Sequence, residues 1–155
     1  MTTRSLTTRS LTPAAGVLFA LLAAGCGNSK PDAVPAGGKV MFNKTTPAAG
    51  ALVVFHPTDP AFEKRVGGKP FAKVKSDGTF SLTTYAEDDG APEGEYGVTV
   101  DWRGKSREGK LSLGDGEGGP AGRPLLNPKY GNPQQPALKA TVKKGDPNQF
   151  TFEVD

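Results

Sequence analysis

Cysteine and histidine are nearly absent from this chain of 155 residues, which contains one of each, Cys26 and His56. A single cysteine excludes an intrachain disulfide, so packing alone must stabilise the fold. A single histidine excludes the common zinc sites built on two histidines, and any Ser-His-Asp arrangement would have to use His56, beside Pro57. We therefore expect His56 to be structural or solvent-exposed, and we expect no metal and no cofactor.

Long hydrophobic runs are also missing. The one clear apolar segment, residues 14–24, has eleven residues, which is too short to span a bilayer as a helix. It follows Arg4 and Arg9, in a region without acidic residues, and ends in the small residues Ala23-Ala24-Gly25 just before Cys26. A basic start, a short apolar segment and small residues at a cut site are typical of a secretory leader. Residues 1–25 are therefore predicted to be a signal peptide.

The end of this leader, from Val17 to Cys26, resembles the lipobox of bacterial lipoproteins. The resemblance implies that a signal peptidase cuts between Gly25 and Cys26 and that the cysteine carries a diacylglyceryl group. It implies a cell-envelope protein anchored to a membrane by lipid. Gly27, where many inner-membrane lipoproteins have aspartate, favours the outer membrane if the cell has one. One departure is Ala23, where the family usually has leucine. The alternative is a soluble secreted protein, although a clean A-x-A cleavage site is missing.

An excess of charge of one sign is absent as well. The two arginines of the leader belong to the 19 basic residues, which leaves 17 basic against 16 acidic residues in the mature chain. Because this balance is near neutral, nucleic acids are not expected as partners. The expected partners are the membrane, through the lipid anchor, and an envelope protein or polysaccharide that the sequence does not identify.

Glycine and proline are abundant, with 21 and 14 residues. Residues 26–37 lack periodicity and are predicted to be the lipidated cysteine and a flexible tether. The eleven tether residues reach roughly 35 Å when extended. Residues 57–70 are a predicted loop. Residues 104–136 are predicted to form a long glycine- and proline-rich loop, with a short strand at 110–113. The contacts predicted to dock this loop on the body are Leu125, Leu126 and Tyr130.

Apolar and polar residues alternate in short runs, the pattern of β-strands with one buried face. The clearest run places Tyr96, Val98, Val100 and Trp102 on one face, and no helical periodicity follows the leader. The turn Ser76-Asp77-Gly78 between two runs predicts a hairpin. These runs indicate an all-β fold, an antiparallel sandwich of about seven strands. The predicted strands are residues 39–43, 51–56, 71–75, 79–83, 96–102, 138–143 and 150–154.

Several turns and core strands form a set that matches a known domain. They are Gly38-Lys39-Val40, Pro47 to Pro57, Ser76 to Phe80, Gly94 to Val100, Pro128-Lys129-Tyr130 and Asn148 to Phe152. The set resembles the carboxypeptidase regulatory-like or transthyretin-like domain of bacterial envelope lipoproteins. The resemblance covers most of residues 38–155 and implies an Ig-like or transthyretin-like sandwich there, without implying an activity. Tyr96, at the start of a strand, is predicted to form a tyrosine corner with the preceding loop.

Groups suited to catalysis are few. Glu87, Asp88 and Asp89 would suit calcium, but they lack EF-hand spacing and are better explained as a solvated turn. Residues 115–119 are glycine-rich but lack the lysine and the strand–helix context of a phosphate loop. We therefore expect a non-catalytic structural or binding module rather than a hydrolase or metal-dependent enzyme. The alternative is a carbohydrate-binding module, since aromatic rings stack on sugars. The candidate ligand contacts are Trp102, Tyr85 and Tyr130, although Trp102 is expected mainly in the core.

Overall fold

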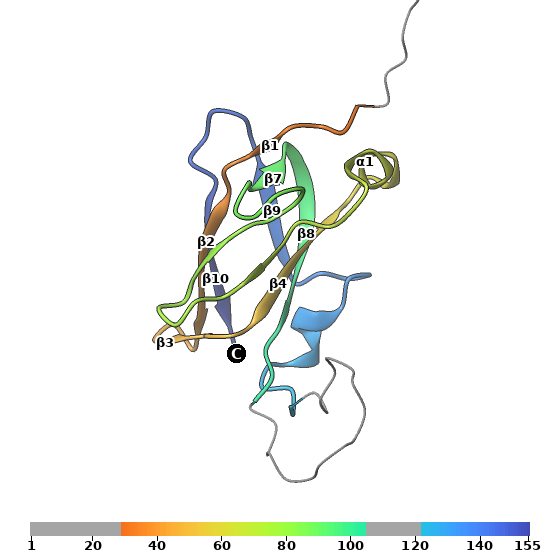
Figure 1. Cartoon of the computed structure of the whole chain (residues 1–155). Helices are drawn as coiled ribbons and strands as arrows, with labels where there is room; N and C mark the ends of the chain where they lie inside the picture. The colour runs from red at the N-terminus through yellow and green to blue at the C-terminus, as the bar shows by residue number, and fades with distance from the viewer. Residues whose placement is uncertain (1–28, 105–121) are drawn as a thin grey trace, which may run out of the picture.

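The computed structural model describes residues 29–104 and 122–155. These residues form mainly β-strands, so the all-β prediction is confirmed at this level (Figure 1). None of the helices in these two ranges is long and apolar enough to cross a membrane. In chain order the elements are β1 (Ala33–Val34), β2 (Gly37–Phe42), β3 (Thr46–Pro47), β4 (Leu52–Pro57), α1 (Pro60–Val66), β5 (Phe71–Lys73), β6 (Thr79–Ser81), β7 (Ala91–Pro92), β8 (Gly94–Asp101), the 3-10 helix η1 (Pro128–Gly131), β9 (Leu138–Val142) and β10 (Gln149–Val154).

The strands form two four-stranded sheets and a two-stranded sheet of β1 and β7. The first large sheet has the order β5-β4-β8-β9 and is antiparallel throughout. The second contains β10-β2-β3, with β6 also paired to β2, and here β10 runs parallel to β2. The prediction of an entirely antiparallel fold is wrong for this pair. An alternating pattern determines which face of a strand is buried, but it carries no information on the direction of the neighbouring strand.

The apolar faces of the two large sheets meet in one core. Phe55 on β4 contacts two residues of β10, with ring centroids 5.7 Å from Phe150 and 6.2 Å from Phe152. Burial of this surface is the main source of stability in a chain that cannot form an internal disulfide. The predicted inward residues are mostly buried, whereas Trp102 is half-buried at the edge of the core. The largest fully buried side chains include Val40, Val53, Phe55, Leu82, Tyr96, Val98 and Val142.

Helix α1 lies inside the predicted loop 57–70, so that prediction is wrong for these residues. Asp59 caps the helix, because its carboxylate accepts a hydrogen bond from a backbone amide of the first turn at 2.9 Å. Pro60 follows, where its missing N–H is not needed, and Gly67 ends the helix with a φ of 71°. With seven residues the helix is too short for a recognisable periodicity, and only its caps indicate it. Its buried residues are Phe62 and Val66.

The folded body begins before residue 38, the predicted boundary. Strand β1 pairs with β7, and Ala36 is buried. Gly90 allows this pairing, since a Cβ there would lie 1.8 Å from the backbone oxygen of Val34. Residues 33–37 therefore belong to the body, and the predicted tether is too long by these residues. The pairing joins segments far apart in sequence, which no local pattern reveals.

Part of the predicted loop 104–136 packs on the outer face of the first large sheet. Gly97 faces outward between two buried residues of β8, and a Cβ there would lie 2.5 Å from the ring of Pro136. Residues 122–136 are thus an ordered covering segment, and they include η1. The strand predicted at 110–113 lies outside the described residues. Of the three residues predicted to dock this loop on the body, Tyr130 is buried, Leu126 is half-buried and Leu125 is exposed.

The predicted hairpin at Asp77 and Gly78 is present. Gly78 has a φ of 84°, and the carboxylate of Asp77 accepts a hydrogen bond from the amide of Thr79 at 2.9 Å. The two arms are joined by backbone hydrogen bonds, from the amide of Lys75 to the oxygen of Thr79 at 2.7 Å and in both directions between Phe71 and Thr83 at 3.0 and 2.8 Å. In addition, β5 pairs with β4 and β6 pairs with β2. The hairpin therefore joins the two large sheets, and its prediction is confirmed.

Candidate functional site

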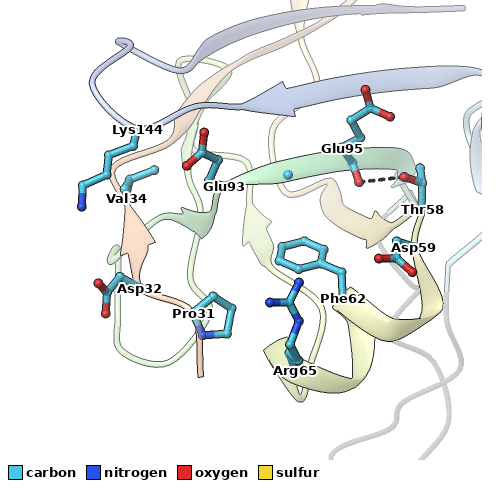
Figure 2. Close-up of a pocket in the computed structure, with 11 residues that line it drawn as sticks. Pro31, Asp32, Val34, Thr58, Asp59, Phe62, Arg65, Glu93, Glu95 and Lys144 are labelled. Atoms are coloured by element: carbon cyan, nitrogen blue, oxygen red, sulfur yellow. Dashed lines mark hydrogen bonds between the residues drawn. The ribbon is translucent and has the colours of Figure 1, made fainter. Parts of the chain in front are cut away.

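An open cleft of about 560 Å³ lies at the end of the molecule where the described chain begins (Figure 2). We call it the N-terminal cleft. Its walls are the segment around β1, helix α1 with the residues before it, the start of β8 and the turn between β9 and β10. The residues that line it are Pro31, Asp32, Val34, Thr58, Asp59, Phe62, Arg65, Glu93, Gly94, Glu95 and Lys144.

Gly94 shapes the N-terminal cleft by leaving space for an aromatic ring. A Cβ on this glycine would lie 2.6 Å from the ring of Phe62. The same ring packs edge-on against Tyr96, with centroids 5.9 Å apart, and the guanidinium of Arg65 lies 5.6 Å from its centre. These contacts hold α1 against β8 and keep the cationic end of Arg65 beside the cleft.

Four carboxylates and two cations line the N-terminal cleft. The carboxylate of Asp59 is engaged as the cap of α1. Within the described part of the chain, the ion pairs include none of Asp32, Glu93, Arg65 and Lys144. Figure 2 shows these four side chains around one hollow, with Asp32 and Lys144 on one side and Arg65 on the other. The cleft thus offers both signs of charge to a ligand.

The acidic turn considered for calcium is held by its own backbone. Asp89 accepts hydrogen bonds from the amides of Thr84, Tyr85 and Ala86 at 2.7, 2.9 and 3.0 Å. Burial opposes ionisation of Asp89, but hydrogen bonds from backbone amides outweigh it and lower the pKa of this carboxyl. In residues 29–104 and 122–155 there is no group of three His, Cys, Asp or Glu side chains that could hold a metal ion.

His56 is half-buried, and its Nε2 lies 2.8 Å from the hydroxyl oxygen of Thr99. Burial lowers the pKa of His56, and the charge of Lys69 lowers it further, while Glu63 acts in the opposite direction. The imidazole is therefore neutral at pH 7 and serves as a hydrogen-bonding partner between β4 and β8. This arrangement agrees with the structural role expected for His56.

A second hollow of about 260 Å³ lies beside Trp102, and we call it the tryptophan groove. The indole Nε1 donates to the backbone oxygen of Ala49 at 2.9 Å, and the ring packs edge-on against Phe42 at 5.5 Å. Trp102 thus closes the margin of the core and also lines the groove. The polar residues beside it are Thr99, Asp101, Arg103 and Asn127.

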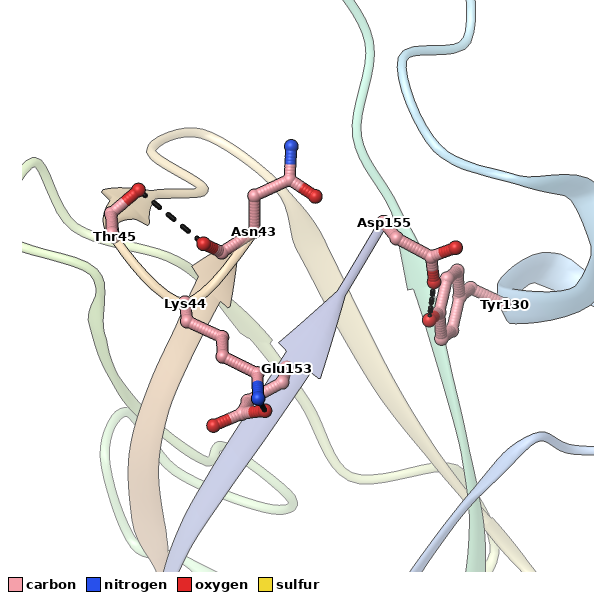
Figure 3. Close-up of polar contacts among 6 residues, drawn as sticks. All are labelled: Asn43, Lys44, Thr45, Tyr130, Glu153 and Asp155. Atoms are coloured by element: carbon pink, nitrogen blue, oxygen red, sulfur yellow. Dashed lines mark hydrogen bonds and ion pairs between the residues drawn. The ribbon is translucent and has the colours of Figure 1, made fainter.

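Tyr130, predicted as a ligand contact, lies in the core rather than on the surface. Its ring is 6% exposed, and its hydroxyl donates to the carboxylate of Asp155 (Figure 3). The ammonium of Lys129 lies 4.7 Å from the ring centre and 2.8 Å from the same carboxylate. In this structure the tyrosine joins η1 to the end of β10, and its ring is not open to a sugar.

Tyr85 is the most exposed of the three predicted aromatic contacts, at 40%. The ammonium of Lys30 lies 5.3 Å from its ring centre. Burial raises the pKa of Tyr85, and the charges of Asp89 and Asp32 raise it further. Tyr85 is therefore near the N-terminal cleft, whereas Trp102 follows the far end of β8. Eight strand residues span about 26 Å, so the aromatic residues do not form one binding surface.

The lipidation and cleavage residues Gly25 and Cys26 lie outside the described residues, as do residues 115–119. No family model, no curated protein and no solved structure matches this chain. Sequence reasoning missed the N-terminal cleft because its walls come from four separate segments. The local signals that existed were the caps of α1 at Asp59 and Gly67 and the glycine at position 94.

Proposed function

We propose that this chain is a lipid-anchored lipoprotein of the cell envelope, held in the outer membrane where there is one, and that its body is a non-catalytic structural or binding module. The leader carries the proposal, since it ends in small residues directly before Cys26, the only cysteine. Strand β1 begins at Ala33, seven positions after Cys26. Seven residues extend over at most about 25 Å, so the anchor would keep the body close to the membrane surface.

The proposal includes an Ig-like or transthyretin-like sandwich for the body. Two four-stranded sheets that share one core support this assignment. A second support is the hydroxyl of Tyr96, which donates to the backbone oxygen of Pro92 at 2.6 Å, as in a tyrosine corner. The parallel pair β10–β2 and the helix α1 are the features that distinguish this body from a plain antiparallel sandwich.

Several polar side chains that catalysis could use are engaged in structural hydrogen bonds, which supports a non-catalytic role. The imidazole of His56 is paired with Thr99, and the carboxylates of Asp59 and Asp89 accept backbone hydrogen bonds. General acid–base catalysis needs such groups free to face a substrate. The open hollows are lined by charged and apolar side chains, which suits recognition.

Metabolic labelling with radioactive palmitate tests the anchor. The full wild-type chain expressed in a bacterial host should incorporate label and sediment with membranes. The matched variant Cys26→Ser should incorporate none, because the oxygen cannot form the thioether with the lipid. A wild-type chain without label, recovered in the soluble fraction, would overturn the proposal.

The alternative is carbohydrate binding at the tryptophan groove, favoured by the position of Trp102 between Asp101, Arg103 and Asn127. Because the chain has one tryptophan, its fluorescence reports on this groove directly. Titration of the full chain with a panel of polysaccharides should change the emission if the alternative holds. Arg103→Ala should weaken such a response, whereas the control Arg123→Ala, outside the groove, should not. A panel without response counts against carbohydrate binding.

A further inference from the structure

We propose that the N-terminal cleft binds a phospholipid headgroup that carries both a primary ammonium and a phosphate, as phosphatidylethanolamine does. Such binding would dock the protein on the membrane that holds it. The proposal rests on the lipid anchor at Cys26 as the reason why a membrane lipid is the occupant. The binding chemistry itself depends on the charges and the position of the cleft.

The charges of the N-terminal cleft match a ligand with two opposite charges. Arg65 and Lys144 can donate to a phosphate, Arg65 through its planar fork and Lys144 as a point charge. Asp32 and Glu93 can accept from a primary ammonium. All four side chains are exposed, and the ion pairs of the described residues do not include them. A headgroup would therefore meet them without breaking an internal pair.

The excess of carboxylates over cations in the cleft determines which phospholipid headgroups it should bind. Four carboxylates against two cations disfavour a ligand that brings only negative charge, such as inorganic phosphate or phosphatidylglycerol. A ligand with its own ammonium compensates for the extra carboxylates. A quaternary ammonium carries the same charge but has no N–H donor, so phosphatidylcholine should bind less tightly than phosphatidylethanolamine.

The position of the cleft brings it within reach of the headgroups. Asp32 follows Cys26 by six positions, and six residues span at most about 22 Å. In each leaflet the headgroup region is about 5 to 8 Å thick, since the whole bilayer exceeds its hydrocarbon core by 10 to 15 Å. Figure 1 places β1, β7 and α1 at one end of the molecule and the C-terminus at the other. An anchored chain would thus present a high local concentration of lipid to this end.

The test is a titration of the full mature chain, ¹⁵N-labelled and held in dodecyl maltoside micelles, followed by NMR. Dihexanoylphosphatidylethanolamine should shift the amide signals of Gly94 and Arg65 saturably. Dihexanoylphosphatidylcholine should bind several-fold more weakly, and inorganic phosphate should leave both signals in place. Equal responses to all three, or no response to the ethanolamine lipid, would overturn the headgroup site.

Two pairs of variants sharpen the titration. Arg65→Ala should weaken binding about tenfold, the effect of one charged hydrogen bond, whereas Lys64→Ala on the same helix should not. Glu93→Gln should also weaken binding, with Glu87→Gln as its control. Unchanged affinity in Arg65→Ala would overturn the assignment.

Palmitate labelling separates the two proposals, because a labelled Cys26 with a silent titration refutes the cleft alone. An unlabelled Cys26 refutes the anchor and the docking together.

Discussion

At the scale of single residues, Tyr96 buries a large ring and still satisfies its hydroxyl. The ring is 1% exposed and contacts Phe55 and Phe62, with centroids 5.5 and 5.9 Å apart. Its hydroxyl donates to the backbone oxygen of Pro92. Burial raises the pKa of Tyr96 well above its ordinary value, and Tyr85 adds to the effect. The hydroxyl therefore remains a donor throughout the physiological pH range.

We expect Tyr96→Phe to destabilise the fold by about 1 to 2 kcal/mol, because the buried oxygen of Pro92 loses its donor while the ring is kept. Urea unfolding of the full chain measures this change. Tyr85→Phe is the control, since its side chain is exposed, and it should change stability by less than about 0.5 kcal/mol. Equal effects in both variants would show that the corner hydrogen bond contributes nothing specific.

Asp89→Asn should destabilise the chain by about 1 to 2 kcal/mol at pH 7, because an amide replaces one of the two accepting oxygens. The folded-state pKa of Asp89 is lowered. Its contribution is therefore fully present above the unfolded value of about 3.9 and is lost as the pH falls through the folded value. The difference in unfolding free energy between wild type and variant should shrink from pH 7 to pH 3. Glu87→Gln is the control, and a pH-independent difference contradicts the prediction.

How far single residues can be predicted depends on whether their partners are local. The tyrosine corner of Tyr96 was predictable because its acceptor, Pro92, lies four positions earlier. Tyr130 was expected to dock the loop on the body, but its partner Asp155 lies 25 positions away, so no local pattern indicated this hydrogen bond. The same holds for His56 and Thr99, which are neighbours only because β4 and β8 pair.

At the scale of elements, alternation predicted the strands well, whereas the pairing of strands was predicted only at the hairpin of Asp77 and Gly78. The run at residues 96–102 became β8, in which the predicted face is buried and Gly97 and Thr99 on the other face are buried as well. The parallel partner of β2, the pairing of β5 with β4 and the pairing of β6 with β2 depend on contacts between distant segments. Helix α1 is a different case, because its capping residues Asp59 and Gly67 are visible in the sequence. A search for capping residues, rather than for helical periodicity, would have located α1.

Gly94→Ala tests the junction of α1 and β8. The new Cβ would lie 2.6 Å from the buried ring of Phe62, so the helix must move or the core must reorganise. We expect a loss of about 1 to 3 kcal/mol in the free energy of unfolding. Gly68→Ala is the matched control, since a Cβ there meets no atom within 4 Å. Similar stabilities of the two variants would mean that the close approach at Gly94 does not hold the helix.

At the scale of the whole molecule, the two hollows lie at opposite ends of β8. The N-terminal cleft surrounds Gly94, and the tryptophan groove adjoins Trp102. The sequence indicated the aromatic residues but not their separation, because the distance follows from the length of the strand and the direction of each side chain. The anchor proposed at Cys26 would give the two ends different roles, with the N-terminal cleft toward the membrane and the tryptophan groove away from it.

This orientation predicts the reactivity of two exposed lysines. Lys144 lines the N-terminal cleft, whereas Lys44 follows β2 at the opposite end, in a weak surface pair with Glu153 at 3.7 Å (Figure 3). A bulky amine-reactive polyethylene glycol ester, quantified by mass spectrometry, should modify Lys144 several-fold less than Lys44 in phospholipid vesicles. In detergent the ratio of Lys144 modification to Lys44 modification should return toward one, because the bilayer no longer covers the N-terminal end. A ratio that is the same in vesicles and detergent would mean that the anchored body has no fixed orientation.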